Sequence, residues 1–172
     1  MSIGLYDATV ATFMQTLGGV DGYLARGLEH CRDKHIDLKD IVETRLYPDM
    51  LPLRFQVMST IAHSIGAIEA IRRGVFSPPP TPDYDYEALQ KAVAEAREKL
   101  AQLSRDEIEG FLGRDMKFEF HGRTIPFTAE NFLLSFSTPN FFFHASTAYG
   151  ILRSKGVPLG KRDFMGMLRI KR

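Results

Sequence analysis

The stretch YEALQKAVAEAREKLAQL, residues 86–103, has the most regular helical pattern in the chain. Its apolar residues alternate steps of three and four, which is the spacing of a helix that packs along the seam of a bundle. These residues are Tyr86, Leu89, Val93, Ala96, Leu100 and Leu103. Lys91, Glu95 and Lys99 follow each other at four-residue spacing and favour an exposed opposite face. The stretch therefore predicts a long amphipathic helix.

Two further long helices are predicted before this stretch. The first covers about residues 5–31, where Gly18 and Gly19 indicate a bend or a close neighbour, because glycine weakens a helix interior. The second covers residues 53–73 and ends at Gly74, a residue type that commonly ends helices. A linker with at most one helical turn lies between them, over residues 36–52, and a stiff proline-rich linker follows, over residues 77–82.

The part of the chain after residue 103 combines a short helix, a hairpin and a last helix. Ser104 and Glu107 predict a capping box. Residues 116–128 alternate apolar and polar side chains around a central turn and predict a β-hairpin. A last helical region opens at Thr128 or Asn131; we expect Pro139 to break it and a new helix to run from residue 140 to about residue 154.

These elements predict an all-α fold, namely a four-helix bundle with a small β-hairpin between the third and fourth long helices. The 172 residues suit a single domain, 1–172, and its net charge of +1 does not favour nucleic acid or an anionic membrane as a partner. No apolar run approaches the ~20 residues of a membrane span, and no secretory signal is evident. The single Cys31 excludes an internal disulfide and fits a cytoplasmic location.

Polar residues on two predicted helices form the candidate site. Gln56, Thr60 and His63 form a polar stripe on the second helix, and Asn140 and His144 share one face of the last helix. If the two helices face each other, these five side chains converge. One interpretation is a buried hydrogen-bond network that sets the helix register, and the other is a ligand or metal pocket between helices.

Metal chemistry and nucleophilic catalysis find limited support in this pattern. His63 and His144 are one short of the three protein ligands that are usual for catalytic zinc, and no Asp or Glu lies on either helix face to complete the set. Ser146 is two residues from His144 and therefore points to a different side of the helix. The sequence does not decide whether the protein is an enzyme.

Four stretches resemble the DinB/YfiT-like metalloenzyme superfamily of four-helix bundles, and more specifically a bacterial domain-of-unknown-function branch of it. They are Leu53-Arg54-Phe55-Gln56-Val57 with Thr60 through His63, then Pro139-Asn140 through His144, then Ala148-Tyr149-Gly150-Ile151-Leu152-Arg153, and Gly160-Lys161-Arg162-Asp163-Phe164. We also predict Tyr149, in the third of these stretches, as a residue of the pocket. The resemblance also implies a homodimer.

In the wider superfamily, one histidine of the second helix and a histidine pair on the last helix bind a divalent metal, often zinc or nickel. The resemblance puts His63 and His144 at the first two ligand positions and Ala148 at the third, where a methyl group cannot bind a metal. We therefore favour a DinB-like protein that binds a small molecule in a polar pocket with an incomplete ligand set. The alternatives are a divalent-metal-dependent hydrolase or thiol transferase, and a non-catalytic dimeric interaction protein.

Overall fold

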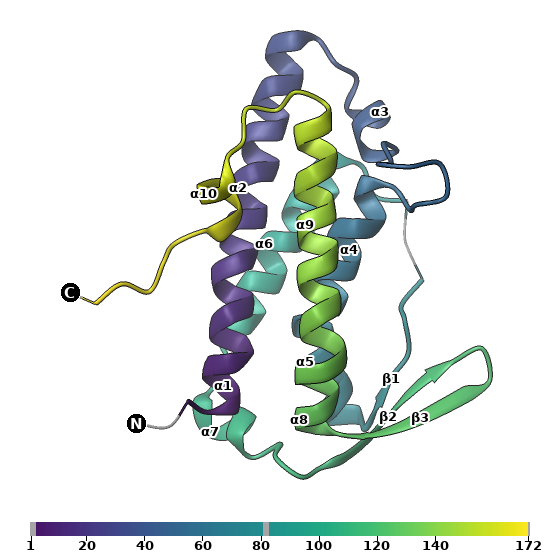
Figure 1. Cartoon of the computed structure of the whole chain (residues 1–172), viewed down its shortest axis with the longest axis vertical. Helices are drawn as coiled ribbons and strands as arrows, with labels where there is room; N and C mark the ends of the chain where they lie inside the picture. The colour runs from purple at the N-terminus through teal and green to yellow at the C-terminus, as the bar shows by residue number, and fades with distance from the viewer. Residues whose placement is uncertain (1–2, 81–82, 172) are drawn as a thin grey trace.

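The computed structural model of the protein describes residues 3–80 and 83–171, and this part of the chain is mostly helical with one small sheet (Figure 1). The longer helices are α2 (Val10–Lys34), α4 (Leu53–Ala62), α5 (Ile65–Arg73), α6 (Tyr86–Ala101) and α9 (Thr138–Ser154). The shorter helical segments are α1 (Leu5–Ala8), α3 (Leu38–Val42), α7 (Arg105–Glu109), α8 (Ala129–Asn131), the π-helix η1 (Phe132–Ser137) and α10 (Lys161–Met165). The strands are β1 (Val75–Phe76), β2 (Asp115–Phe120) and β3 (Arg123–Thr128). In the described residues, no helix is both long and apolar enough to cross a membrane.

The long helices pack on one another and bury the apolar stripes that the sequence predicts. α2 packs on α6 and α9, and α4 packs on the same two helices. All six apolar positions of residues 86–103 are buried, with exposed fractions between 0% and 7%. Asp85 begins α6, because its carboxylate accepts a hydrogen bond from the Ala88 N–H. The predicted seam helix is therefore confirmed.

The first predicted helix is interrupted at Thr9 and not at its glycine pair. Thr9 has non-helical angles (φ −117°, ψ −81°) and separates α1 from α2. α2 continues through Gly18 and Gly19 without a break. A Cβ atom on Gly19 would lie 2.3 Å from the backbone oxygen of Phe164, which belongs to α10. Of the two explanations offered for this glycine pair, the close neighbour is the one that the structure supports.

The second predicted helix is divided into α4 and α5, which corrects the single helix over residues 53–73. Ser64 has non-helical angles (φ −112°, ψ −97°), and its hydroxyl donates to the backbone oxygens of Thr60 and Ile61 at 2.9 and 3.0 Å. A serine that bonds to the preceding turn competes with the helix ladder. His63 therefore lies at the end of α4 and not in the middle of a long helix. The end of α5 at Gly74, in the left-handed conformation (φ 78°), is as predicted.

The predicted break at Pro139 is wrong, because the helical path continues from α8 through η1 into α9. Pro139 lies in the first turn of α9, directly after the π-helix. A proline ring clashes with the carbonyl four residues earlier in an α-helix. The wider π-turn shifts the hydrogen-bond pairing by one residue at this point and accommodates the ring. As a consequence, η1 and α9 present their side chains along one continuous wall.

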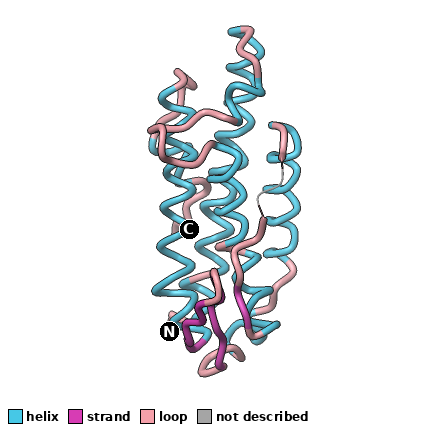
Figure 2. The backbone as a smooth tube through the Cα atoms, turned by 90° about the vertical axis from the view of Figure 1, so that its right-hand side faces the viewer, coloured by secondary structure: helices cyan, strands magenta, loops and turns pink. Residues whose placement is uncertain are grey.

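The sheet has three strands in the order β1-β2-β3 and lies at one end of the helices, as Figure 2 shows. The predicted hairpin is confirmed: β2 and β3 are antiparallel, and Phe120 pairs with Arg123 across the turn. His121 and Gly122 both have positive φ, at 49° and 75°, as a tight two-residue turn requires. β1, which the sequence did not predict, pairs in parallel with β2 and sets Phe76 beside Phe118.

The connecting segments agree with the predictions where they are described. α3 supplies the single helical turn expected in residues 36–52. Ser104 accepts a hydrogen bond from the Glu107 N–H and caps α7. Residues 77–80 of the proline-rich linker are exposed and have no regular structure. The rest of that predicted linker, residues 81 and 82, lies outside the described residues.

Candidate functional site

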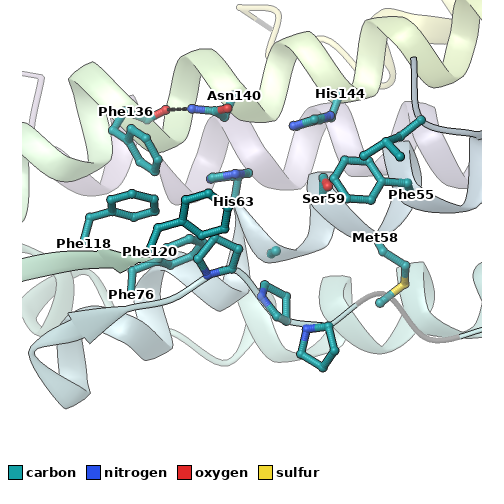
Figure 3. Close-up of a pocket in the computed structure, with 15 residues that line it drawn as sticks. Phe55, Met58, Ser59, His63, Phe76, Phe118, Phe120, Phe136, Asn140 and His144 are labelled. Carbon is teal, nitrogen blue, oxygen red and sulfur yellow. Dashed lines mark hydrogen bonds between the residues drawn. The ribbon is translucent and has the colours of Figure 1, made fainter. Parts of the chain in front are cut away.

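A cavity of about 780 Å³ lies between α4, α9 with η1, and the sheet. Figure 3 shows the side chains that line it. Phe76 comes from β1, Phe118 and Phe120 come from β2, and a run of three prolines follows β1. The complete lining is Leu51, Phe55, Met58, Ser59, Ala62, His63, Phe76, Pro78, Pro79, Pro80, Phe118, Phe120, Phe136, Asn140 and His144. The cavity therefore combines a helical wall that carries polar groups with an aromatic and proline wall.

The apolar wall is a cluster of aromatic rings that hold one another in place. The Phe118 and Phe136 ring centroids are 4.9 Å apart, and those of Phe76 and Phe118 are 6.1 Å apart. Phe76 is buried, whereas Phe118 and Phe136 are half-buried, so that part of their surface faces the cavity. Rings at such separations prefer tilted or offset contacts and leave faces and edges for a further ring.

His144 is held in one orientation by Gln56. The distance from its Nδ1 to Oε1 of Gln56 is 2.8 Å. The Gln56 amide is itself oriented, because its Nε2 donates to the Leu51 backbone oxygen at 2.8 Å. Oε1 of Gln56 therefore accepts, and Nδ1 of His144 must carry the proton. In the neutral ring this leaves a lone pair on Nε2 of His144.

His63 lies at the end of α4 and packs against three other rings of the site, those of Phe76, Phe136 and His144. Its ring stacks on Phe76 with centroids 5.3 Å apart, and it lies nearly parallel to the His144 ring with centroids 5.9 Å apart. Its Nδ1 is 3.5 Å from the hydroxyl oxygen of Ser137 in η1. The two imidazoles therefore come from different helices and lie next to each other (Figure 3).

Both histidines are neutral at pH 7, because burial disfavours the charged imidazolium. Burial lowers the pKa of His144 to about 4. Burial first, and then the neighbouring His144, lower the pKa of His63 to about 4. A neutral imidazole offers one N–H donor and one lone pair, which can accept a hydrogen bond or bind a metal.

Of the six candidate pocket residues, the structure places three on the cavity wall, namely His63, Asn140 and His144. Gln56 lies behind His144 and bonds to it, so it contacts the site without lining it. Thr60 is fully buried and donates to the Gln56 backbone oxygen at 2.8 Å. Gln56 and Thr60 thus form a supporting layer behind the wall.

Two of the candidates have contacts that differ from the predicted convergence. The Asn140 Nδ2 donates to the Phe136 backbone oxygen at 2.8 Å, along its own helical path. The Tyr149 ring packs at an edge-on angle against Tyr23 and Phe164, at 6.1 and 5.9 Å, and it is not among the lining residues. The polar convergence is therefore centred on Gln56 and the two histidines.

Several lining residues were not among the sequence candidates. Ser59 lies four residues before His63, a spacing that places both on one helix face and that could have identified it. Phe76 and the prolines of residues 78–80 had no such signal. They reach the cavity because β1 pairs with β2, and a two-residue strand is too short to be recognised by alternation.

The metal site that the resemblance implies requires a third ligand. Across residues 3–80 and 83–171, no group of three or more His, Cys, Asp or Glu side chains could hold a metal ion. Ala148, at the third position, is fully buried in α9. The two histidines alone do not fit the three-ligand arrangement of catalytic zinc, and we derive no chemical step through a metal.

Comparisons with known proteins agree with this fold. The family described as "Domain of unknown function (DUF1993)" matches residues 5–165. The crystal structure of a DinB family member protein from Shewanella denitrificans is similar, with a TM-score of 0.78 and 23% sequence identity. The similarity covers 98% of this chain and 95% of that chain, and at this identity it shows the fold alone. Among curated proteins there is no match.

Proposed function

The chain belongs to the DUF1993 family of DinB-like domains, and from that premise we propose that it is a binding protein for a small, largely apolar molecule held in the cavity between α4, α9 and the sheet. A fold of this kind does not by itself imply an activity, because function depends on the residues of the site. The main support for this proposed function is an aromatic cavity whose two histidines are both neutral and already oriented.

The size and lining of the cavity support this proposal. A volume of about 780 Å³ lies within the range of sites for small organic molecules, roughly 300–1,000 Å³. Such sites are mostly hydrophobic and aromatic, and a few polar groups in fixed positions orient the ligand. Here Phe55, Phe76 and Phe136 supply apolar area, while His63 and His144 supply the polar groups.

The hydrogen bonds behind the cavity wall indicate that the site is already formed before a ligand binds. The chain of hydrogen bonds from Leu51 through Gln56 to His144 holds the ring without help from a ligand. A side chain that is already oriented loses little conformational entropy on binding. We further infer that α2, α4 with α5, α6 and α9 act as a four-helix bundle, which is the rigid frame that this arrangement needs.

The two alternative functions lead to different observations. A divalent-metal hydrolase or thiol transferase would have to complete the shell of His63 and His144 with Asn140, Gln56 or water, and elemental analysis would then find zinc or nickel in the untagged protein. A dimeric interaction protein would need its dimer surface and not its cavity. The homodimer itself remains a prediction that static light scattering tests, and a monomeric mass would contradict it.

A neutral fluorophore tests the proposed function. N-phenyl-1-naphthylamine is nearly dark in water and bright in an apolar site, and we expect its fluorescence to rise and saturate at one molecule per chain. The variant Ser59→Trp adds a large side chain to the cavity wall and is expected to weaken binding at least about tenfold, since it removes volume and contact area.

The matched control is Ser146→Trp, which adds the same side chain at an exposed position of α9. Ser146 does not line the cavity, so this variant should bind the fluorophore as the native chain does. Circular dichroism melting establishes that both variants are folded. Absence of binding by the native chain, or equal binding by folded Ser59→Trp, would refute the proposed function.

A further inference from the structure

One hydrogen-bonding group of the cavity wall is fixed as an acceptor. Nδ1 of His144 donates to Gln56, so a neutral His144 offers its Nε2 lone pair to the cavity. The Asn140 amide can do both: one N–H of its Nδ2 donates to the Phe136 carbonyl, which leaves its second N–H and its Oδ1 acceptor for other partners. A ligand that bonds to His144 must therefore bring a donor.

The wall also lacks charge. Among the described residues that line the cavity, none is Asp, Glu, Lys or Arg. Phosphates and carboxylates are bound by cationic side chains or by sets of N–H donors. A wall of neutral side chains and phenyl rings supplies no cation. The polar wall therefore selects against anions and favours a neutral molecule.

The rings around the histidines favour a flat ligand. The Phe55 ring meets the His144 ring at 72° with centroids 5.8 Å apart, and Phe136 meets His63 at 66° and 5.6 Å. The apolar side of the cavity adds the faces and edges of Phe76 and Phe118. Aromatic rings gain from offset and edge-to-face contacts beyond simple area burial. A planar aromatic molecule can use these contacts, whereas a flexible aliphatic chain cannot.

We propose that the cavity recognises a neutral phenol, that is, a planar aromatic molecule whose hydroxyl donates to Nε2 of His144 while its rings pack among Phe55, Phe76 and Phe136. This inference rests on the proposed function and specifies the ligand class of the same site. Gln56 is a positioning residue in this arrangement, because it keeps the proton on Nδ1 and so keeps Nε2 free to accept.

Three bicyclic probes of nearly equal shape test this assignment by isothermal titration calorimetry. 2-Naphthol carries the hydroxyl donor, 2-methoxynaphthalene replaces it by an ether that cannot donate, and naphthalene has no polar group. We expect 2-naphthol to bind the native chain at least about fivefold more tightly than either of the others, the difference that one hydrogen bond makes. His144→Phe should abolish this preference and still bind naphthalene. The matched control His30→Phe, on α2 and outside the cavity, should retain the preference.

A measurement on the native chain gives the same answer without a variant, in case His144→Phe does not fold. In nitrogen-15 spectra of the histidine rings, 2-naphthol should shift the unprotonated Nε2 signal of one cavity histidine, and 2-methoxynaphthalene should not. Equal affinity for all three probes would overturn the phenol assignment and leave the proposed function intact. If none of the three probes binds, the proposed function fails as well. A preference for 2-naphthol that survives in folded His144→Phe would also overturn the assignment.

Discussion

As the pH falls, this protein should begin to lose stability before its carboxylates become protonated. The reason is that two histidines are held neutral inside it. The pKa values of His63 and His144 lie near 4 in the folded chain, below the ordinary value of 6.5. Between these two values the unfolded chain binds a proton at each ring and the folded chain does not. The stabilisation is therefore complete above pH 6.5 and is lost as the pH falls toward 4.

The size of the effect follows from the two pKa values. For one ring that titrates at 6.5 unfolded and near 4 folded, lowering the pH from 6.5 to 5 reduces the free energy of unfolding by about 1.5 kcal/mol. The two rings together should reduce the free energy of unfolding by roughly 3 kcal/mol over this pH range, if each contributes equally. Most carboxylates remain ionised down to pH 5, so this window isolates the histidines.

Urea denaturation at pH 6.5 and pH 5 measures this loss. We expect His63→Phe, which keeps a flat ring beside Phe76, to remove about half of the loss, or roughly 1.5 kcal/mol. His30→Phe serves as the control and should behave as the native chain, because His30 lies outside the cavity. If native and His63→Phe chains lose the same free energy of unfolding between the two pH values, the reasoning about a neutral His63 is refuted.

Two further predictions concern the supporting structure. Gln56→Leu leaves the N–H of the His144 ring without its partner and should lower the free energy of unfolding by about 1–3 kcal/mol in urea denaturation. Gly19→Ala should lower it by about 1–3 kcal/mol, because the new Cβ would lie 2.3 Å from the Phe164 oxygen and displace α10. Gly22→Ala in the same helix has open space and should raise it by up to about 1 kcal/mol.

The controls for these predictions come from the same chain. Gln102→Leu changes an exposed glutamine and should shift the free energy of unfolding by less than about 0.5 kcal/mol. A Gln56→Leu chain as stable as this control would contradict the role of Gln56. A Gly19→Ala chain as stable as Gly22→Ala would contradict the close approach of α10.

The helical part of the fold could be predicted because its pattern is local. The apolar positions of residues 86–103 are buried as their spacing indicates, and the hairpin turn at His121 and Gly122 follows from turn chemistry. The interruptions could not be predicted in the same way. Ser64 interrupts the helix because its hydroxyl donates to the backbone of the preceding turn. Pro139 is accommodated by a π-turn. Neither effect changes the spacing of the apolar residues.

The candidate site was predictable on its helical side only. His63 and His144 face each other because α4 packs on α9, as two polar stripes on apolar helices indicate. The aromatic wall depends on the pairing of β1 with β2, a contact between residues about forty positions apart that no local pattern records. Tyr149, which was predicted as a pocket residue, packs instead against Tyr23 and Phe164.

The claim that this cavity is a binding site is tested most directly by a crystal structure of the chain grown with N-phenyl-1-naphthylamine. We expect one molecule between α4, α9 and the sheet, with its rings against Phe76 and Phe136 and its N–H within hydrogen-bond distance of His144. An empty cavity, or a molecule bound only elsewhere on the surface, would contradict the proposed binding site.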